Sequence, residues 1–229
     1  MRLGRQARRV VGNRDGARVD LDDGEAVEVD VIVLGTGRRP RVQDLGLETV
    51  GIDVAAWDGR GIPVDEHCRF GDGLWAVGDV TGQALFTHVA KYQGRVAADT
   101  ICGRPRRACY DGIPRVIFAD PEIAAVGMTG ATARDRGVEV AMSEVDLPAT
   151  ISRPWTYETE PRGTLGLLVD RHRRVLVGAW AVAPLAGESI HQAALAIRAA
   201  VPVDTLLDQV AQFPTYTEAY LSAMEQMKL

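Results

Sequence analysis

The chain has 229 residues, of which 46% are hydrophobic and 25% are charged. These values are typical of globular proteins and exclude a disordered or collagen-like chain. Acidic residues outnumber basic ones by 31 to 26, and the formal net charge of -5 gives no reason to expect nucleic acid as a partner. The longest apolar run, at 175–187, is too short to cross a bilayer, so we expect no membrane partner.

Cysteine is sparse, with Cys68, Cys102 and Cys109 as the three in the chain. This odd and small number predicts no disulfide framework and favours a reducing compartment, so we expect a cytoplasmic protein. The spacing between Cys102 and Cys109 is not one that metal sites use, and we expect no metal centre. The basic first residues, MRLGRQARRVVG, are not followed by the apolar stretch of a secretory signal.

Residues 8–34 predict two or three strands. Residues 18–21 alternate between polar and apolar side chains, and the Asp-Asp-Gly sequence at 22–24 is a hairpin-turn signal. The run VIVL at 31–34 is apolar throughout, which is typical of a strand buried on both faces.

A glycine-rich segment follows this run. Gly35 and Gly37 let the backbone approach a ligand closely, and Pro40 stops the strand. Arg38 and Arg39, beside these glycines, fit either an anionic cofactor or a surface ion pair.

The middle of the chain predicts a strand, a loop and a helix in that order. Residues 74–77 predict a second buried strand, which ends directly at Gly78 and Asp79, and residues 87–102 predict a helix. A carboxylate at the carboxyl end of a strand lies where open α/β sheets bind ligands. From the residues alone, Asp79 fits either an acceptor for the hydroxyl groups of a nucleotide or a turn aspartate that caps a loop.

The last half of the chain has a different character. After a linker at 110–113, strands are expected at 116–118, 123–126, 138–147, 164–170 and 175–182, and helices at 189–200 and 217–227. Runs of strands followed by helices indicate an α+β domain with an antiparallel sheet.

Five separate motifs occur in a characteristic order. They are GTGRRP at 35–40, GIPVD at 61–65, LWAVGDVTG with THVA at 74–90, PRVIFADPEIAAVGMT at 114–129, and FPTYTE at 213–218. In this order the chain resembles the C-terminal half of the pyridine nucleotide-disulfide oxidoreductase family, whose members include dihydrolipoamide dehydrogenase, glutathione reductase and mercuric reductase. The resemblance implies a fold of α/β plus α+β class. It also implies the last strands of an NAD(P)-binding domain at 1–40, the end of an FAD-binding domain at 41–112, and a dimerisation domain at 113–229.

The resemblance also implies roles for individual residues. Asp79 matches the family's aspartate that binds the ribityl chain of FAD, with Gly78 beside it, and Gly37 matches a glycine that contacts NAD(P)H. The segment that faces the flavin ring at a helix start is matched by Leu85, Phe86, Thr87 and His88. From the residues alone His88 fits either a helix cap or a group that tunes the flavin. A homodimer is implied as the assembly.

The chain departs from the family pattern in two ways. It has neither the G-x-G-x-x-G fingerprint of dinucleotide-binding domains nor the family's C-x4-C redox pair. An N-terminal half, or a separate chain that supplies it, is therefore an expected partner. The family's C-terminal H-P-x-x-x-E has a histidine base where this chain has Phe213, while Glu218 keeps its place as a weak catalytic candidate.

Two functions are compatible with this pattern. In the first, the chain is part of an FAD-dependent NAD(P)H oxidoreductase whose electron acceptor is not a conventional disulfide, because phenylalanine cannot transfer a proton. In the alternative, it is a non-catalytic dimerisation module with a vestigial flavin half-site. Tyr216 is a conceivable substitute acid in the first function and an interface packing residue in the second.

Overall fold

The structure is a computed structural model that describes residues 2–13, 16–57 and 59–229. It divides into two compact units, residues 1–98 and 99–229. Its mixed α/β content with antiparallel sheets confirms the predicted fold class. Among the described residues, no helix is both long enough and apolar enough to span a bilayer.

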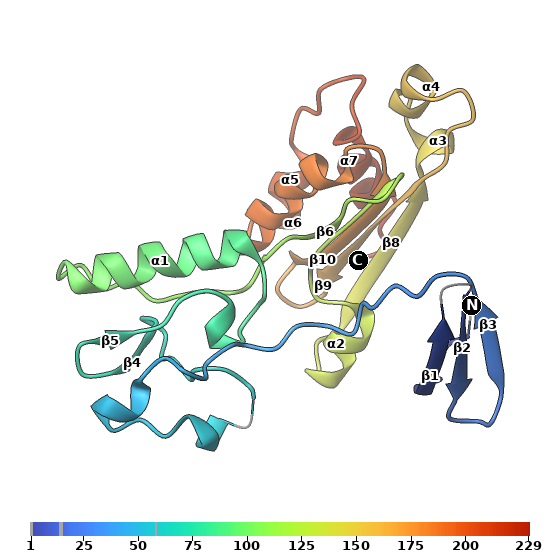
Figure 1. Cartoon of the computed structure of the whole chain (residues 1–229). Helices are drawn as coiled ribbons and strands as arrows, with labels where there is room; N and C mark the ends of the chain where they lie inside the picture. Colours follow the sequence, from blue (N-terminus) through green and yellow to red (C-terminus); the bar gives the residue numbers. More distant parts are fainter. Residues whose placement is uncertain (1, 14–15, 58) are drawn as a thin grey trace. The chain divides into compact units, whose positions relative to one another are not determined.

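The first unit begins with a three-stranded antiparallel meander (Figure 1). Its strands are β1 (Ala7–Asn13), β2 (Gly16–Leu21) and β3 (Ala26–Val29), paired in chain order. The predicted hairpin turn between β2 and β3 is confirmed, since the Leu21 amide donates to the Glu25 carbonyl at 2.8 Å.

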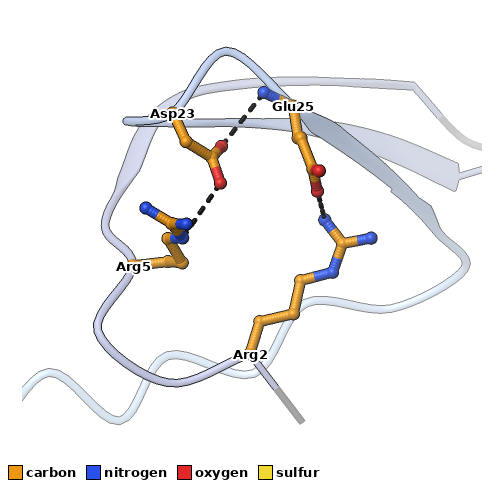
Figure 2. A network of polar contacts seen from close by, with 4 residues as sticks. All are labelled: Arg2, Arg5, Asp23 and Glu25. Atoms are coloured by element: carbon orange, nitrogen blue, oxygen red, sulfur yellow. Dashed lines mark hydrogen bonds and ion pairs between the residues drawn. The ribbon is translucent and has the colours of Figure 1, made fainter.

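Two ion pairs hold the segment before β1 against this turn (Figure 2). Arg2 pairs with Glu25, and the Nε of Arg5 lies 2.9 Å from Oδ2 of Asp23. The Asp23 carboxylate also accepts from the Glu25 amide at 3.0 Å. The turn is therefore closed by side chains as well as by the backbone ladder.

The expected buried strand at 31–34 was wrong. β3 ends at Val29, and residues 31–34 form no strand. Val33 is 88% exposed and Leu34 is 79% exposed. An apolar run becomes a buried strand only when neighbouring strands pair with its backbone and cover its faces. No strand in the described part of the chain pairs with this run.

The rest of the first unit has little regular structure before its helix. It contains three 3-10 helices, η1 (Leu47–Val50), η2 (Val54–Trp57) and η3 (Asp79–Thr81), and a short hairpin of β4 (Arg69–Gly71) and β5 (Leu74–Trp75). A small core gathers Val42, Ile62 and Ala76. The strand expected at 74–77 is correct in place but has two residues, because β4 offers it only a short, irregular partner.

Helix α1 (Thr87–Ile101) confirms the helix expected at 87–102. Its buried side chains are Val89, Gln93, Val96 and Ala97, which recur at the spacing of one helix face. The division between the two units falls within this helix.

The second unit is built on a five-stranded antiparallel sheet in the order β6-β7-β10-β9-β8. The strands are β6 (Arg115–Ile117), β7 (Glu122–Gly127), β8 (Val140–Asp146), β9 (Thr164–Asp170) and β10 (Val175–Ala183). The five expected strands are thus confirmed. Gly166 of β9 faces Trp180 of β10, and a Cβ at Gly166 would overlap the indole ring, so only glycine fits there.

Two long helices cover one face of this sheet (Figure 1). Helix α5 (Ala186–Arg198) packs on β7 and β10, and α7 (Glu218–Glu225) packs on β8 and β9. They bury one continuous apolar core that includes Leu167, Ile190 and Tyr220. Both correspond to expected helices, although α5 begins three residues before the expected start at 189.

Four short helices in this unit were not expected. They are α2 (Gly130–Asp135), α3 (Leu147–Thr150), α4 (Arg153–Tyr157) and α6 (Val203–Leu207). Side chains of the preceding residues cap the first two, since Thr129 accepts from the Thr132 amide and Asp146 accepts from the Ala149 amide.

Candidate functional site

Gly78 turns the chain sharply at the carboxyl end of the β5 segment. Its backbone has φ 82° and ψ -154°, a conformation that is essentially restricted to glycine. A Cβ at this position would lie 3.1 Å from the Cβ of Ala90 in α1. Both the conformation and the close approach of the helix therefore require glycine here.

A buried polar network fixes this turn. The Gly78 amide donates to Oε1 of Gln93 at 2.6 Å, and Nε2 of Gln93 donates to the Thr81 hydroxyl at 3.3 Å. The Thr81 hydroxyl in turn donates to the Gly78 carbonyl at 2.8 Å. Gln93 is fully buried, so its amide holds the turn in a setting that water does not reach.

The turn presents Asp79 at its surface. The Asp79 side chain is 50% exposed, and one of its oxygens, Oδ2, lies 3.4 Å from Nη1 of Arg38. A carboxylate has about four lone-pair sites, so this contact leaves it able to accept from hydroxyl groups of a ligand. Nη2 of Arg38 also donates to the Leu85 carbonyl.

The expected flavin-facing segment leads into α1. Leu85 and Phe86 are half-buried and precede the helix, while Thr87 and His88 are exposed in its first turn. The rings of Phe86 and His88 stack with centroids 5.1 Å apart and planes 17° apart. The positive end of the helix dipole lies at this segment, so it favours negative charge on a neighbouring group.

Gly37 also adopts a conformation that favours glycine, with φ 97°. No described protein atom lies within 4 Å of the place where its Cβ would be. The backbone is open to solvent at this point, one residue before the arginine that contacts Asp79.

The C-terminal motif lies in the second unit. Phe213 is 62% exposed, and Tyr216 is buried. Glu218 begins α7, and its Oε2 is buried without a hydrogen-bond partner in the described residues. The catalytic role expected for Glu218 stays a prediction.

A cavity of about 470 Å³ adjoins this motif. It is lined by Arg153, Leu185, Glu188, Ser189, Pro214, Thr215, Tyr216 and Thr217. Burial raises the pKa of Tyr216, and the nearby Glu158 carboxylate raises it further. The phenol therefore stays protonated at neutral pH.

The described residues contain no group of three or more His, Cys, Asp or Glu side chains that could hold a metal ion. None of the three cysteines forms a disulfide in the part of the chain that the structure describes, and Cys68 is buried.

One residue of the candidate site, Gln93, was not predicted, and the partner of a second, Arg38, was not predicted either. Gln93 is a polar side chain on the apolar face of α1. A polar residue at such a position indicates a buried hydrogen-bond partner, so the sequence pattern could have identified it. The sequence shows that Arg38 stands beside two glycines, but its ion pair with Asp79 joins positions 41 residues apart, which no local pattern predicts.

Comparisons with known proteins agree on one family. The family model for pyridine nucleotide-disulphide oxidoreductases matches residues 1–94, and the model for their dimerisation domain matches residues 113–224. The dihydrolipoyl dehydrogenase of Geobacillus stearothermophilus is 33% identical over 216 residues, which are 92% of this chain and 45% of that protein. The glutathione reductase of Burkholderia cepacia is 34% identical over 97% of this chain and 49% of its own length.

Solved structures give the same result. The crystal structure of LpdA from Mycobacterium tuberculosis matches 97% of this chain with a TM-score of 0.86 and 28% identity, over 48% of its own length. The HOCl-induced flavoprotein disulfide reductase RclA from Escherichia coli matches 96% of this chain with a TM-score of 0.84 and 25% identity, over 50% of its length.

The chain spans about half the length of the curated relatives that it matches. Within that half, the matches run across both compact units and include the predicted dimerisation domain. The chain therefore belongs to the pyridine nucleotide-disulphide oxidoreductase family.

Proposed function

We propose that the chain is the C-terminal part of an FAD-dependent NAD(P)H oxidoreductase, in which it supplies part of the flavin site and the homodimer interface. The observation that carries this proposal is the turn at Gly78 and Asp79, which Gln93 locks against α1. The proposed domain limits are those expected from the sequence, with the flavin residues in 41–112 and the interface in 113–229.

The residues of the first unit fit FAD. Asp79 has an exposed carboxylate for ribityl hydroxyl groups, and Gly78 allows the sharp turn and the close approach of α1 that place it. Thr87 and His88 are exposed at the start of α1, where negative charge is favoured. Gly37 leaves its backbone open to NAD(P)H. FAD, when bound, would supply the redox chemistry by accepting a hydride from NAD(P)H and passing electrons to an acceptor.

The acceptor in this proposal is not a conventional disulfide. The side chain at the position of the family's base is Phe213, which holds no proton, and Glu218 has no described partner to orient. An acceptor such as a quinone needs no protein base at this position, because its reduction depends on the flavin.

The homodimer is proposed through the second unit. The family's dimerisation-domain model matches residues 113–224, and this region exposes more than half of each of several large apolar side chains, namely Ile117, Phe118, Trp155, Leu195 and Val210. An N-terminal half would complete the flavin and nicotinamide sites. The small and odd number of cysteines suits a reducing cytoplasm, where we place this function.

The alternative function is a dimerisation module without turnover. The exposed apolar run at 31–34 favours it, since this segment is not integrated into a nucleotide-binding sheet in the structure described. The two functions differ in whether the chain binds flavin.

Titration of the purified chain with FAD, followed by flavin fluorescence, distinguishes them. Asp79→Asn is expected to weaken FAD binding about tenfold, because a charge-assisted hydrogen bond is lost. Asp72→Asn, at a fully exposed carboxylate of the same unit, is the matched control and should bind like the unmodified chain. Equal affinities for the two variants would contradict the role of Asp79, and no binding by any of them would support the dimerisation module.

A further inference from the structure

Arg38 joins three segments of the first unit. It follows Gly37 in the glycine-rich segment, and its Nη1 lies 3.4 Å from Oδ2 of Asp79 in the turn. Its other terminal nitrogen, Nη2, donates to the Leu85 carbonyl just before α1. One guanidinium therefore connects positions that lie 41 and 47 residues away in sequence.

We infer that Arg38 is a positioning residue of the flavin site, which orients the Asp79 carboxylate and the start of α1 toward the ligand. The role toward flavin rests on the proposed function. The link among the three segments rests only on the two contacts of Arg38.

The chemistry of the guanidinium suits this role. It carries five N–H donors in a fixed planar arrangement and stays charged at every pH a protein tolerates. When it holds Oδ2 of Asp79, it leaves Oδ1 to accept from a ligand hydroxyl. Its second bond fixes the carbonyl of Leu85 two residues before α1 begins. Its charge also adds to the positive end of the helix dipole at the same place.

The contacts are exposed, and this decides what to measure. The side chains of Arg38 and Asp79 are 60% and 50% exposed, and exposed ion pairs contribute little to global stability. A positioning role therefore predicts a change in local order and in ligand affinity, with little change in melting temperature. An ordinary surface ion pair predicts no change in local order and no change in ligand affinity.

The neighbouring residue, Arg39, offers a matched control. It is exposed, and the described residues give it no hydrogen bond and no ion pair. Arg39→Gln removes the same charge from the same segment without removing the link.

The first test is amide hydrogen exchange of the ligand-free chain, compared among the unmodified protein, Arg38→Gln, Arg38→Lys and Arg39→Gln. Arg38→Gln should speed exchange at residues 36–41 and 84–88, while Arg39→Gln should not. Arg38→Lys should resemble Arg38→Gln, because a single ammonium group cannot hold both acceptors in the planar arrangement. Exchange in Arg38→Gln equal to that in Arg39→Gln would overturn the inference.

The second test is the affinity for FAD. Arg38→Gln should weaken binding about threefold to tenfold. Arg38→Gln combined with Asp79→Asn should lose less affinity than the two single losses added together, because the part of the effect that acts through Asp79 is already gone, while the contact with Leu85 still contributes. If the two losses of FAD affinity add in full, the claim that Arg38 acts through Asp79 is wrong. If the unmodified chain binds no FAD, the proposed function fails and so does the role toward flavin, whereas the exchange data still decide whether Arg38 links the three segments.

Discussion

The side-chain carbonyl of Gln93 lies 2.6 Å from the amide nitrogen of Gly78, and this hydrogen bond ties the middle of α1 to the end of the β5 segment. The bond is buried and joins the two elements that flank Asp79. The position of the candidate flavin-binding carboxylate therefore depends on a side chain that does not itself face the ligand.

Replacing Gln93 with leucine should destabilise the first unit. Leucine fills a similar volume but leaves the buried Gly78 amide without an acceptor, at a cost of about 1–3 kcal/mol. Urea unfolding measures the effect, with the exposed Gln83→Leu as control, for which a change within about 0.5 kcal/mol is expected. Equal midpoints for the two variants would show that the Gly78 amide finds another partner.

Two glycine-to-alanine substitutions should have opposite effects. Gly78→Ala forces a Cβ into a conformation restricted to glycine and toward Ala90, so a loss of about 1–3 kcal/mol or more is expected. Gly94 lies within α1 with nothing near its Cβ position, and Gly94→Ala should gain about 0.5–1 kcal/mol. Thermal unfolding monitored by circular dichroism measures both, and a stable Gly78→Ala variant would contradict the described backbone.

Asp65 should make the first unit sensitive to acid. The slight desolvation of this exposed carboxyl acts to raise its pKa, but the amides of Arg69 and His67 donate to its Oδ1 and hold the pKa below the usual 3.8. Because the folded-state pKa is depressed, this contribution is present above about pH 4 and is lost as the pH falls through the lower folded value.

The comparison is between the unmodified chain and Asp65→Asn. The unmodified chain should be more stable by less than about 1 kcal/mol at pH 7, since the carboxylate is exposed. The difference should shrink below pH 4, as followed by urea unfolding at several pH values. A difference that stays constant from pH 7 to pH 3 would mean that the carboxylate charge contributes nothing.

Glu218 should act on a histidine placed at position 213. Its Oε2 is buried and has no described partner, and the F-P-T-Y-T-E motif spaces the two positions as the family's base and its carboxylate. In Phe213→His, the carboxylate should raise the pKa of the introduced imidazole above about 6.5.

Proton NMR titration of the imidazole measures this pKa. The matched comparison is Phe213→His combined with Glu218→Gln, in which the pKa should return to about 6.5. The same pKa in both variants would show that the exposed side chain at 213 points away from Glu218, and the motif match would then not extend to this pair.

Much of the fold follows from local pattern. The bounds of β9 were predicted as Thr164–Asp170, because an apolar run stands between Gly163 and a turn of charged residues. Helix α1 was equally clear, since its apolar spacing ends at Gly103. Short helices such as α2 escaped prediction because their six or fewer residues carry too little periodicity and depend on a cap at Thr129.

The failures have a common physical cause. Residues 31–34 have the composition of a buried strand, but a strand needs partners that composition does not supply. The candidate site shows the same limit, since Asp79 and Gly78 stand out in the sequence while the bonds from Arg38 and Gln93 depend on the folded chain. The sequence marks the residues that would meet a ligand more readily than those that hold them in place.

Native mass spectrometry of the purified chain with excess FAD tests the central claim most directly, because it reports subunit number and bound cofactor together. The proposed function predicts a dimer that carries FAD. At a lower FAD concentration, Asp79→Asn should remain a dimer but carry less FAD than the unmodified chain. A dimer that never carries FAD would contradict the proposed flavin site and would support the alternative function, a dimerisation module without turnover. A monomer would contradict the assignment of the second unit as the dimer interface.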